Sequence, residues 1–247
     1  MFVRACELAA SFTAPVVVST RRAEGSVECG LSAFMIVNDE GWFVTAAHVL
    51  QPEPADMTNQ SYWWGSDERR VERMEVLGPA DLALGRIEPF DAGSVAHYPV
   101  FKREPVVEPG RSVCRLGFPF HSVGATFDEA RGVFELAPGS LPVPRFPVEG
   151  ILTRQHLAGT TDGIEIKFLE TSSPGLRGQS GGPIFDVDGR VRGLQVRTHH
   201  LALGFSPELE IAGEKVRENQ FLNAGIGVHA STILAFLERH GVEVATG

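Results

Sequence analysis

The stretch Gly178-Gln179-Ser180-Gly181-Gly182-Pro183 places a serine hydroxyl in a glycine-rich turn, and Asp188-Gly189 follows a few residues later. Glycine and proline directly after a serine oppose a helix, since glycine costs about 1 kcal/mol and proline about 3 kcal/mol in a helix interior. An Asp-Gly pair is typical of a hairpin turn between two strands. The stretch therefore predicts a strand, not a helix, after Ser180.

The rest of the chain repeats this pattern of short apolar runs separated by turn residues. Only the segment 231–240 has clear helical spacing, with Ser231 as the expected N-cap and Gly241 directly after the end. The sequence predicts an all-β chain with a short C-terminal helix. We expect its strands over residues 14–20, 31–38, 42–50, 71–77, 82–88, 112–117, 148–157, 163–170, 183–187, 190–197 and 224–230.

These strands fall into two sets, separated by a proline-containing stretch around residues 101–110. We expect an N-terminal barrel over residues 1–104 and a C-terminal barrel over residues 105–247, the second ending in the helix. Two long loops, 51–69 and 119–147, interrupt the strands. Loops of that length often act as lids or docking surfaces, and the sequence leaves open whether these two do.

Composition and charge restrict the partners. The chain has 247 residues, of which 43% are apolar, and 22 basic against 31 acidic residues give a net charge of −9. This balance argues against nucleic acid or a membrane surface as partner and favours proteins. No apolar run reaches the ~18 residues of a membrane span, and Glu7 interrupts the region where a signal peptide is apolar, so we expect a cytoplasmic protein.

Three separated residues carry the candidate chemistry: His48, Asp81 and Ser180. A serine hydroxyl needs an adjacent base to take its proton, and His48 is the candidate base. Asp81 would accept a hydrogen bond from the other ring nitrogen and hold the imidazole in one tautomer. The backbone amides of Gly178 and Ser180 would form an oxyanion hole. The chain order His48, Asp81, Ser180 is that of chymotrypsin-type enzymes.

Two other interpretations stay open at this point. The residues Gly178 to Gly182 also fit the Gly-Xaa-Ser-Xaa-Gly turn of α/β-hydrolases, which would make the chain an esterase with Asp188 and His229 as partners of the serine. That fold needs a helix directly after the serine. The second interpretation is a catalytically silent, trypsin-like peptide-binding module that serves as a scaffold.

The sequence resembles the trypsin-like serine proteases, and within them the HtrA/Deg branch, over most of its length. The similarity lies in residues 34–50 (FMIVNDEGWFVTAAHVL), 77–84 (LGPADLAL), 116–120 (LGFPF) and 224–228 (AGIGV), besides the serine stretch. It implies two six-stranded antiparallel β-barrels with the active site between them. It also implies a serine endopeptidase that acts on protein or peptide substrates and needs no metal ion or organic cofactor.

The resemblance also suggests the substrate-binding pocket. Its walls would comprise Pro174, Gly175, Leu176, Val196, Arg197, Thr198 and Gly227. Pro174 stands where trypsin-like enzymes carry the residue at the pocket floor, and proline offers no anion for an Arg or Lys side chain. We therefore expect cleavage after small or medium apolar residues.

The chain departs from secreted trypsins in ways that bear on regulation. Val49 follows His48, so the family's cysteine bridge at that place cannot form, and Gln179 replaces the aspartate that pairs with a new N-terminus after zymogen cleavage. We expect no activation by cleavage, and no PDZ domain in the sequence up to residue 247. A regulatory protein partner acting on the loop 119–147 is the alternative means of control.

Overall fold

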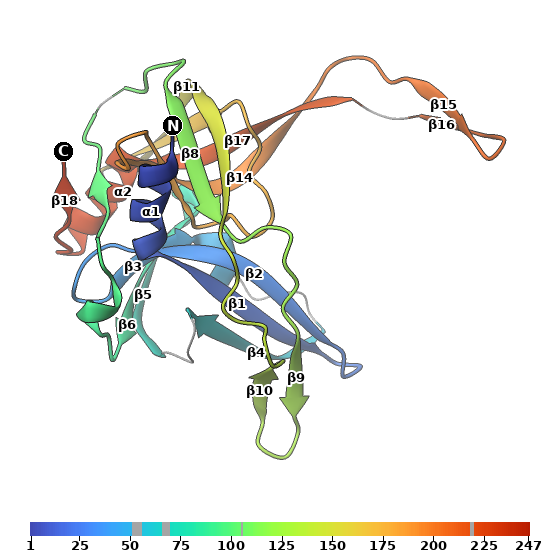
Figure 1. Cartoon of the computed structure of the whole chain (residues 1–247), viewed down its shortest axis with the longest axis horizontal. Helices are drawn as coiled ribbons and strands as arrows, with labels where there is room; N and C mark the ends of the chain where they lie inside the picture. The colour runs from blue at the N-terminus through green and yellow to red at the C-terminus, as the bar shows by residue number, and fades with distance from the viewer. Residues whose placement is uncertain (51–55, 66–69, 105, 218–219) are drawn as a thin grey trace.

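The computed structural model describes residues 1–50, 56–65, 70–104, 106–217 and 220–247, and most of them lie in two antiparallel sheets (Figure 1). The first sheet has the strand order β4-β1-β2-β3-β6-β5. Consecutive strands β1 and β2 pair as an antiparallel hairpin, in which Ala14 lies opposite Phe34. Its strands are β1 (Thr13–Arg22), β2 (Val27–Ile36), β3 (Trp42–Ala46), β4 (Met57–Trp64), β5 (Arg70–Leu77) and β6 (Leu82–Glu88).

The second sheet closes on itself. β13 pairs with both β8 and β14, so that β13, β8, β11, β12, β17 and β14 form a ring, while β7 and β18 extend the sheet beside β14 in parallel. The expected all-β fold of two barrels is confirmed, with the first sheet an open half-barrel within the described residues. The strands are β7 (Val100–Phe101), β8 (Ser112–Gly117), β11 (Phe146–Thr161), β12 (Ile164–Thr171), β13 (Pro183–Phe185), β14 (Val191–Ala202), β17 (Phe221–His229) and β18 (Ala245–Thr246).

The chain passes from the first sheet to the second between β6 and β7, in a stretch that holds the single-turn helix η3 (Ala92–Ser94). β7 thus joins the second sheet slightly before residue 104, and the division into domains at 104 and 105 stays a prediction. One continuous cluster of buried apolar residues contains members of both sheets, such as Phe43 and Leu84 from the first and Phe168 and Val228 from the second. The shared core fixes how the two sheets face each other.

The C-terminal helix is confirmed as α2 (Ala230–Arg239), but its expected cap is wrong. His229 is the N-cap, because β17 continues to that residue and leaves its backbone extended; its ring Nδ1 accepts a hydrogen bond from the Ser231 amide at 3.1 Å. Within the described parts of the chain, no helix is long and apolar enough to span a membrane.

A second helix, α1 (Val3–Phe12), was not expected. Ala5, Ala9 and Phe12 are its buried residues, and their spacing puts them on one helix face. The helix packs on the second sheet, where a Cβ atom added to Gly189 would lie 3.0 Å from the Leu8 side chain. Gly189, in the β13–β14 turn, has no side chain, and this allows α1 to pack closely against the turn.

Both predicted long loops contain strands. The loop expected at 51–69 includes β4, which pairs with β1 and buries Trp64; residues 51–55 and 66–69 lie outside the described residues. The loop 119–147 contains the hairpin β9 (Ala125–Asp128) and β10 (Val133–Leu136). Cross-strand pairing with a distant segment, which no local pattern reports, explains why β4 was missed.

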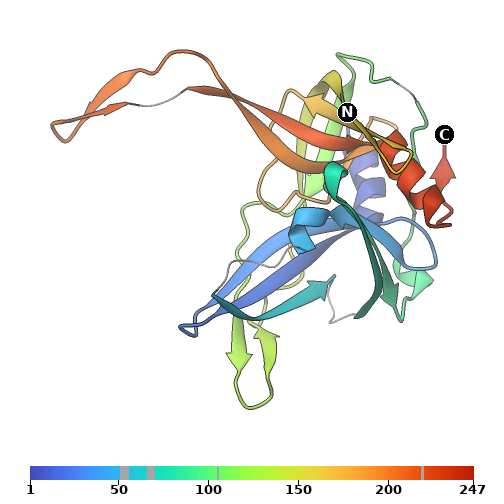
Figure 2. The same ribbon diagram turned by 180° about the vertical axis from the view of Figure 1, so that it is seen from behind.

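The strands β14 and β17 continue past the barrel as a two-stranded arm, which ends in the hairpin β15 (Glu208–Ile211) and β16 (Glu214–Arg217). Figures 1 and 2, which view the molecule from opposite sides, both show this arm extending away from the two sheets. The predicted strand 190–197 therefore runs further than expected. Residues 198–202 (THHLA) are largely exposed and do not alternate between apolar and polar, so the sequence pattern alone does not indicate a strand there.

Candidate active site

His48 and Asp81 meet at one end of the first sheet. His48 lies in the short 3-10 helix η1 (Ala47–Leu50) after β3, and Asp81 follows η2 (Gly78–Ala80) just before β6. Because β3 and β6 are paired neighbours, these two segments lie side by side. The His48 ring Nδ1 is 2.7 Å from Asp81 Oδ2, and the His48 amide donates to Asp81 Oδ1 at 2.8 Å.

The backbone of Asp81 is specialised for this contact. Its φ angle is +53°, in the left-handed region, which aspartate tolerates better than most residues. Its carbonyl oxygen also accepts a hydrogen bond from the Ala47 amide at 3.0 Å. Both the main chain and the carboxylate of Asp81 therefore hold the histidine segment, which orients the imidazole before any substrate arrives.

Ser180 lies in a loop in which the positions on either side, 178 and 181, require glycine. Gly178 has φ +90°, and a Cβ atom there would lie 2.5 Å from the Phe118 carbonyl oxygen. Gly181 has φ +84°, and its Cβ would lie 2.1 Å from the Ala33 carbonyl oxygen. Positive φ and close backbone neighbours together explain the glycines on both sides of the serine.

Hydrogen bonds connect this loop to the histidine segment across the two sheets. The amide of Ala33 on β2 donates to the Ser180 carbonyl oxygen at 2.8 Å, and the buried Thr45 hydroxyl donates to the Ala33 carbonyl oxygen at 2.7 Å. Thr45 precedes His48 by three residues on β3. The backbone around the serine is thereby held in a fixed relation to the histidine.

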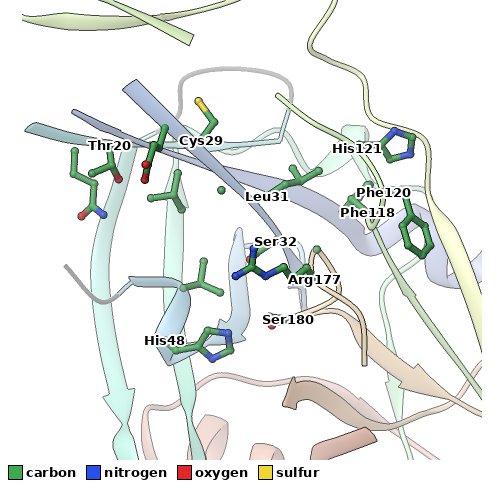
Figure 3. A pocket seen from close by; sticks show the side chains of 16 residues that line it. Thr20, Cys29, Leu31, Ser32, His48, Phe118, Phe120, His121, Arg177 and Ser180 are labelled. Carbon is green, nitrogen blue, oxygen red and sulfur yellow. The ribbon is translucent and has the colours of Figure 1, made fainter. Parts of the chain in front are cut away.

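A cavity of about 590 Å³ has Ser180, His48 and Gly178 among its lining residues (Figure 3). Ser180 Oγ makes no hydrogen bond to His48 or to any other described residue. Such contacts are often long in enzymes without substrate and tighten when substrate binds. The structure thus brings His48 and Ser180 to one cavity, and Asp81 is joined directly to His48.

Two amides beside Ser180 are available as donors. Within the described structure, the Gly178 and Ser180 N–H groups donate to no protein acceptor, whereas the Gln179 amide between them donates to the Leu176 carbonyl oxygen at 3.0 Å. The buried Gln179 side chain closes the same loop, since its Oε1 accepts from the Leu176 amide at 3.0 Å. This positioning role of Gln179 was not predicted, and nothing in the local sequence indicates it.

The residues predicted to form the substrate pocket do not line this cavity, and two of them are joined by a hydrogen bond. The Thr198 hydroxyl donates to the Gly175 carbonyl oxygen at 2.7 Å. Leu176 is tied to Gln179, and Val196 is buried. Gly227 lies within the sheet, paired with Leu169 and Gln195, and the Arg197 guanidinium lies 4.8 Å from the centroid of the Phe168 ring.

Arg115 lies beneath this pocket and was missed in the sequence. Its side chain is almost fully buried and donates to the carbonyl oxygens of Ser173, at 2.8 Å, and Pro174, and to the Thr171 hydroxyl. Burial lowers the pKa of the Arg115 guanidinium to about 10, so it stays charged at neutral pH. An arginine within the apolar strand β8 is the one signal that could have indicated it.

The esterase interpretation does not fit this geometry. The strand β13 follows Ser180 where an α/β-hydrolase needs a helix. Asp188 lies in the β13–β14 turn, and His229 caps α2, where burial lowers its pKa to about 4. Among the described residues, no group of three His, Cys, Asp or Glu side chains is placed to bind a metal ion.

Comparisons with known proteins agree with the fold. The trypsin-like peptidase domain family matches residues 32–194. A probable periplasmic serine endoprotease, DegP-like, from Marinomonas sp. (strain MWYL1) is 25% identical over 180 residues, which are 71% of this chain and 31% of that protein. The chain thus spans about a third of the relative's length, and the expected resemblance to the HtrA/Deg branch is confirmed.

A solved structure shares the fold. The crystal structure of the Rv3671c protease from M. tuberculosis in its active form has a TM-score of 0.55 and 15% identity, covering 99% of this chain and 88% of that one. The family match extends from β2 to β14 and so includes all three candidate catalytic residues. The chain belongs to the trypsin-like peptidase domain family.

Proposed function

We propose that this chain is an endopeptidase in which Ser180 attacks the carbonyl carbon of a peptide bond. His48 takes the hydroxyl proton and then gives it to the leaving amine, which departs as the C–N bond breaks and an acyl-enzyme remains. Water, deprotonated by His48, hydrolyses that ester and restores Ser180. Asp81 orients the imidazole, and the amides of Gly178 and Ser180 bind the oxyanion.

One observation carries this proposal: His48, joined to Asp81 at 2.7 Å, lines the same cavity as Ser180 and the two free amides. Base, orienting carboxylate, nucleophile and oxyanion donors are the complete set that acyl transfer requires. Nothing in this set calls for a metal ion or an organic cofactor as a participant.

The proposed cleavage site follows small or medium apolar residues. The hydrogen bond from Thr198 to Gly175 connects opposite walls of the proposed pocket and so favours small side chains. The Arg115 charge below Pro174 disfavours Arg and Lys in the pocket through like-charge repulsion. A peptide-library profile dominated by Arg or Lys before the cleaved bond would contradict this preference.

The test of the activity is Ser180→Ala. We expect the variant to lose roughly 10⁶-fold in turnover, by analogy with another serine protease, while its circular dichroism stays that of the parent. Mass spectrometry of peptides released from a cell lysate by the parent, and not by the variant, would identify the substrates at the same time. Equal cleavage by both proteins would overturn the proposal.

A catalytically silent peptide-binding module is the second candidate, because no hydrogen bond joins Ser180 Oγ to His48 in this state. A fluorophosphonate probe separates the two candidates, since it reacts only with an activated serine.

Control by a protein partner is compatible with the first candidate, because Phe120 and His121 of the loop 119–147 line the cavity. Constitutive casein turnover by the purified chain alone would count against such control. Cytoplasmic location also stays a proposal; the DegP-like relative is named as periplasmic, and cell fractionation would decide.

A further inference from the structure

Arg177 lines the cavity beside Ser180 and is a cation with no partner among the described residues. Its exposed side chain extends into the cavity beside Ser180, near Ser32 (Figure 3). Within the described parts of the chain, its guanidinium makes no hydrogen bond and no ion pair. In a protein with a net charge of −9, an arginine left unpaired beside the nucleophile indicates that its partner comes from outside.

The rest of the cavity lining leaves this charge unbalanced. Glu28 is the one acidic residue among the lining residues, and its carboxylate already accepts from Arg22 at 2.9 Å. Asp81, the next carboxylate, is bound to His48. The cavity therefore offers a guanidinium, with hydroxyl and amide groups from Ser32 and Gln60, and no competing free carboxylate.

Arg197, a second exposed arginine near the serine loop in the predicted pocket, provides a contrast. Its guanidinium lies over the Phe168 ring, so its cation already has a partner within the protein. Of these two exposed arginines, Arg177 is therefore the better candidate to bind an acidic side chain from outside.

The position of the cavity decides which part of a substrate meets Arg177. None of the residues predicted to bind the substrate before the cleaved bond lines this cavity. Its walls come from β1, β2 and β4 of the first sheet and from residues 118–121, with Gly178 and Ser180 at the border. A polypeptide that presents its carbonyl to Ser180 therefore places the residues after the cleaved bond in this cavity.

We propose that the cavity recognises an acidic side chain, Asp or Glu, within the first three residues after the cleaved bond, with Arg177 as its partner. This inference rests on the proposed endopeptidase function. A guanidinium can donate two parallel hydrogen bonds to a carboxylate, which gives geometry as well as charge attraction. The site contributes to specificity on the leaving-group side, where the sequence had predicted no recognition.

The experiment uses internally quenched peptides with alanine before the cleaved bond and Glu, Gln or Lys at each of three positions after it. At one position, we expect the parent to cleave the Glu peptide with roughly ten times the kcat/KM of the Lys peptide. Arg177→Gln should bring this ratio close to one, Arg177→Glu should invert it, and Arg177→Lys should keep part of it. Arg4→Gln, which removes an exposed charge on α1, should leave the ratio unchanged.

Salt and direct binding complete the test. The Glu-over-Lys ratio should shrink as ionic strength rises, because the pair is exposed. Binding of the same peptides to Ser180→Ala, followed by fluorescence polarisation, should show the same order and lose it when Arg177→Gln is added.

The outcomes separate the two proposals. In one outcome, the parent cleaves the Gln peptide while Arg177→Glu leaves the Glu-over-Lys ratio of kcat/KM unchanged. That result would overturn the acidic site and leave the peptidase proposal intact. If no peptide is cleaved and Ser180 takes no fluorophosphonate label, the peptidase proposal fails. The binding order in Ser180→Ala then still decides for or against the acidic site.

Discussion

The two halves of the groove differ in how far they are assembled. On the first sheet, His48 and Asp81 are joined by two hydrogen bonds, at 2.7 and 2.8 Å, and His48 borders a cavity of about 590 Å³. On the second sheet, the Ser180 hydroxyl has no protein partner within the described residues, and the proposed pocket walls contact each other through Thr198 and Gly175. If the proposed function is correct, we expect the base to be oriented before substrate binds, and the nucleophile and the pocket to adjust on binding.

Asp81→Asn breaks the assembled half and has the largest expected effect. The asparagine oxygen would keep accepting from the His48 backbone amide, so the NH2 group would face Nδ1 and donate to it, which leaves the imidazole in the wrong tautomer toward Ser180. We expect kcat to fall by roughly 10⁴-fold with the fold unchanged. Steady-state peptide hydrolysis measures the loss, and Asp162→Asn, on an exposed turn, is the control. Near-parental turnover would show that the pair does not orient the base.

Gly178→Ala tests the other half. Its Cβ would lie 2.5 Å from the Phe118 carbonyl oxygen, at a φ angle that side chains rarely adopt, so the amide must move away from the oxyanion position. Loss of one such donor lowers kcat by about 10²- to 10³-fold. Gly132→Ala, also at positive φ but with open space around the Cβ, controls for backbone strain alone. Equal effects of the two variants on kcat would argue against an oxyanion hole at Gly178.

The smallest expected effect is a loss of folding stability at low pH, caused by His229 at the end of β17 in the second sheet. Burial, with the nearby Lys167 and Arg192 charges, lowers the pKa of His229 to about 4, against an ordinary value of 6.5. Above pH 6.5 the residue is neutral in both states; below it, the unfolded chain takes up the proton first, so stability falls as the pH drops toward 4. The expected loss between pH 7.5 and 5 is about 2 kcal/mol.

His229→Asn removes this titration and keeps an N-cap acceptor for α2. Urea unfolding of parent and variant at the two pH values gives the comparison. The variant should lose less stability on acidification than the parent. An equal loss in both proteins would assign acid sensitivity to other groups.

What the sequence predicted was set by local patterns. Glycine and proline around Ser180, turn residues between apolar runs, and the segments around His48 and Asp81 indicate strands and chemistry without knowledge of distant contacts. The spacing of Ala5, Ala9 and Phe12 was also a local signal, and α1 could have been predicted from it.

What was missed depends on residues far apart in the chain. β4 is a strand because it pairs with β1, and Arg115 is buried because carbonyl groups of residues 173 and 174 accept its hydrogen bonds. The contact of Thr198 with Gly175, and the open position of Arg177, likewise follow from how loops meet at the groove. Periodicity contains no information on such encounters.

The central claim is that His48 activates the Ser180 hydroxyl, and the rate of labelling by a fluorophosphonate probe tests it most directly. In the parent, we expect the label on Ser180 by peptide mapping, and in His48→Gln a labelling rate lower by about 10³-fold or more. A labelling rate that does not change when the imidazole is removed, or a label on another residue, would contradict the account.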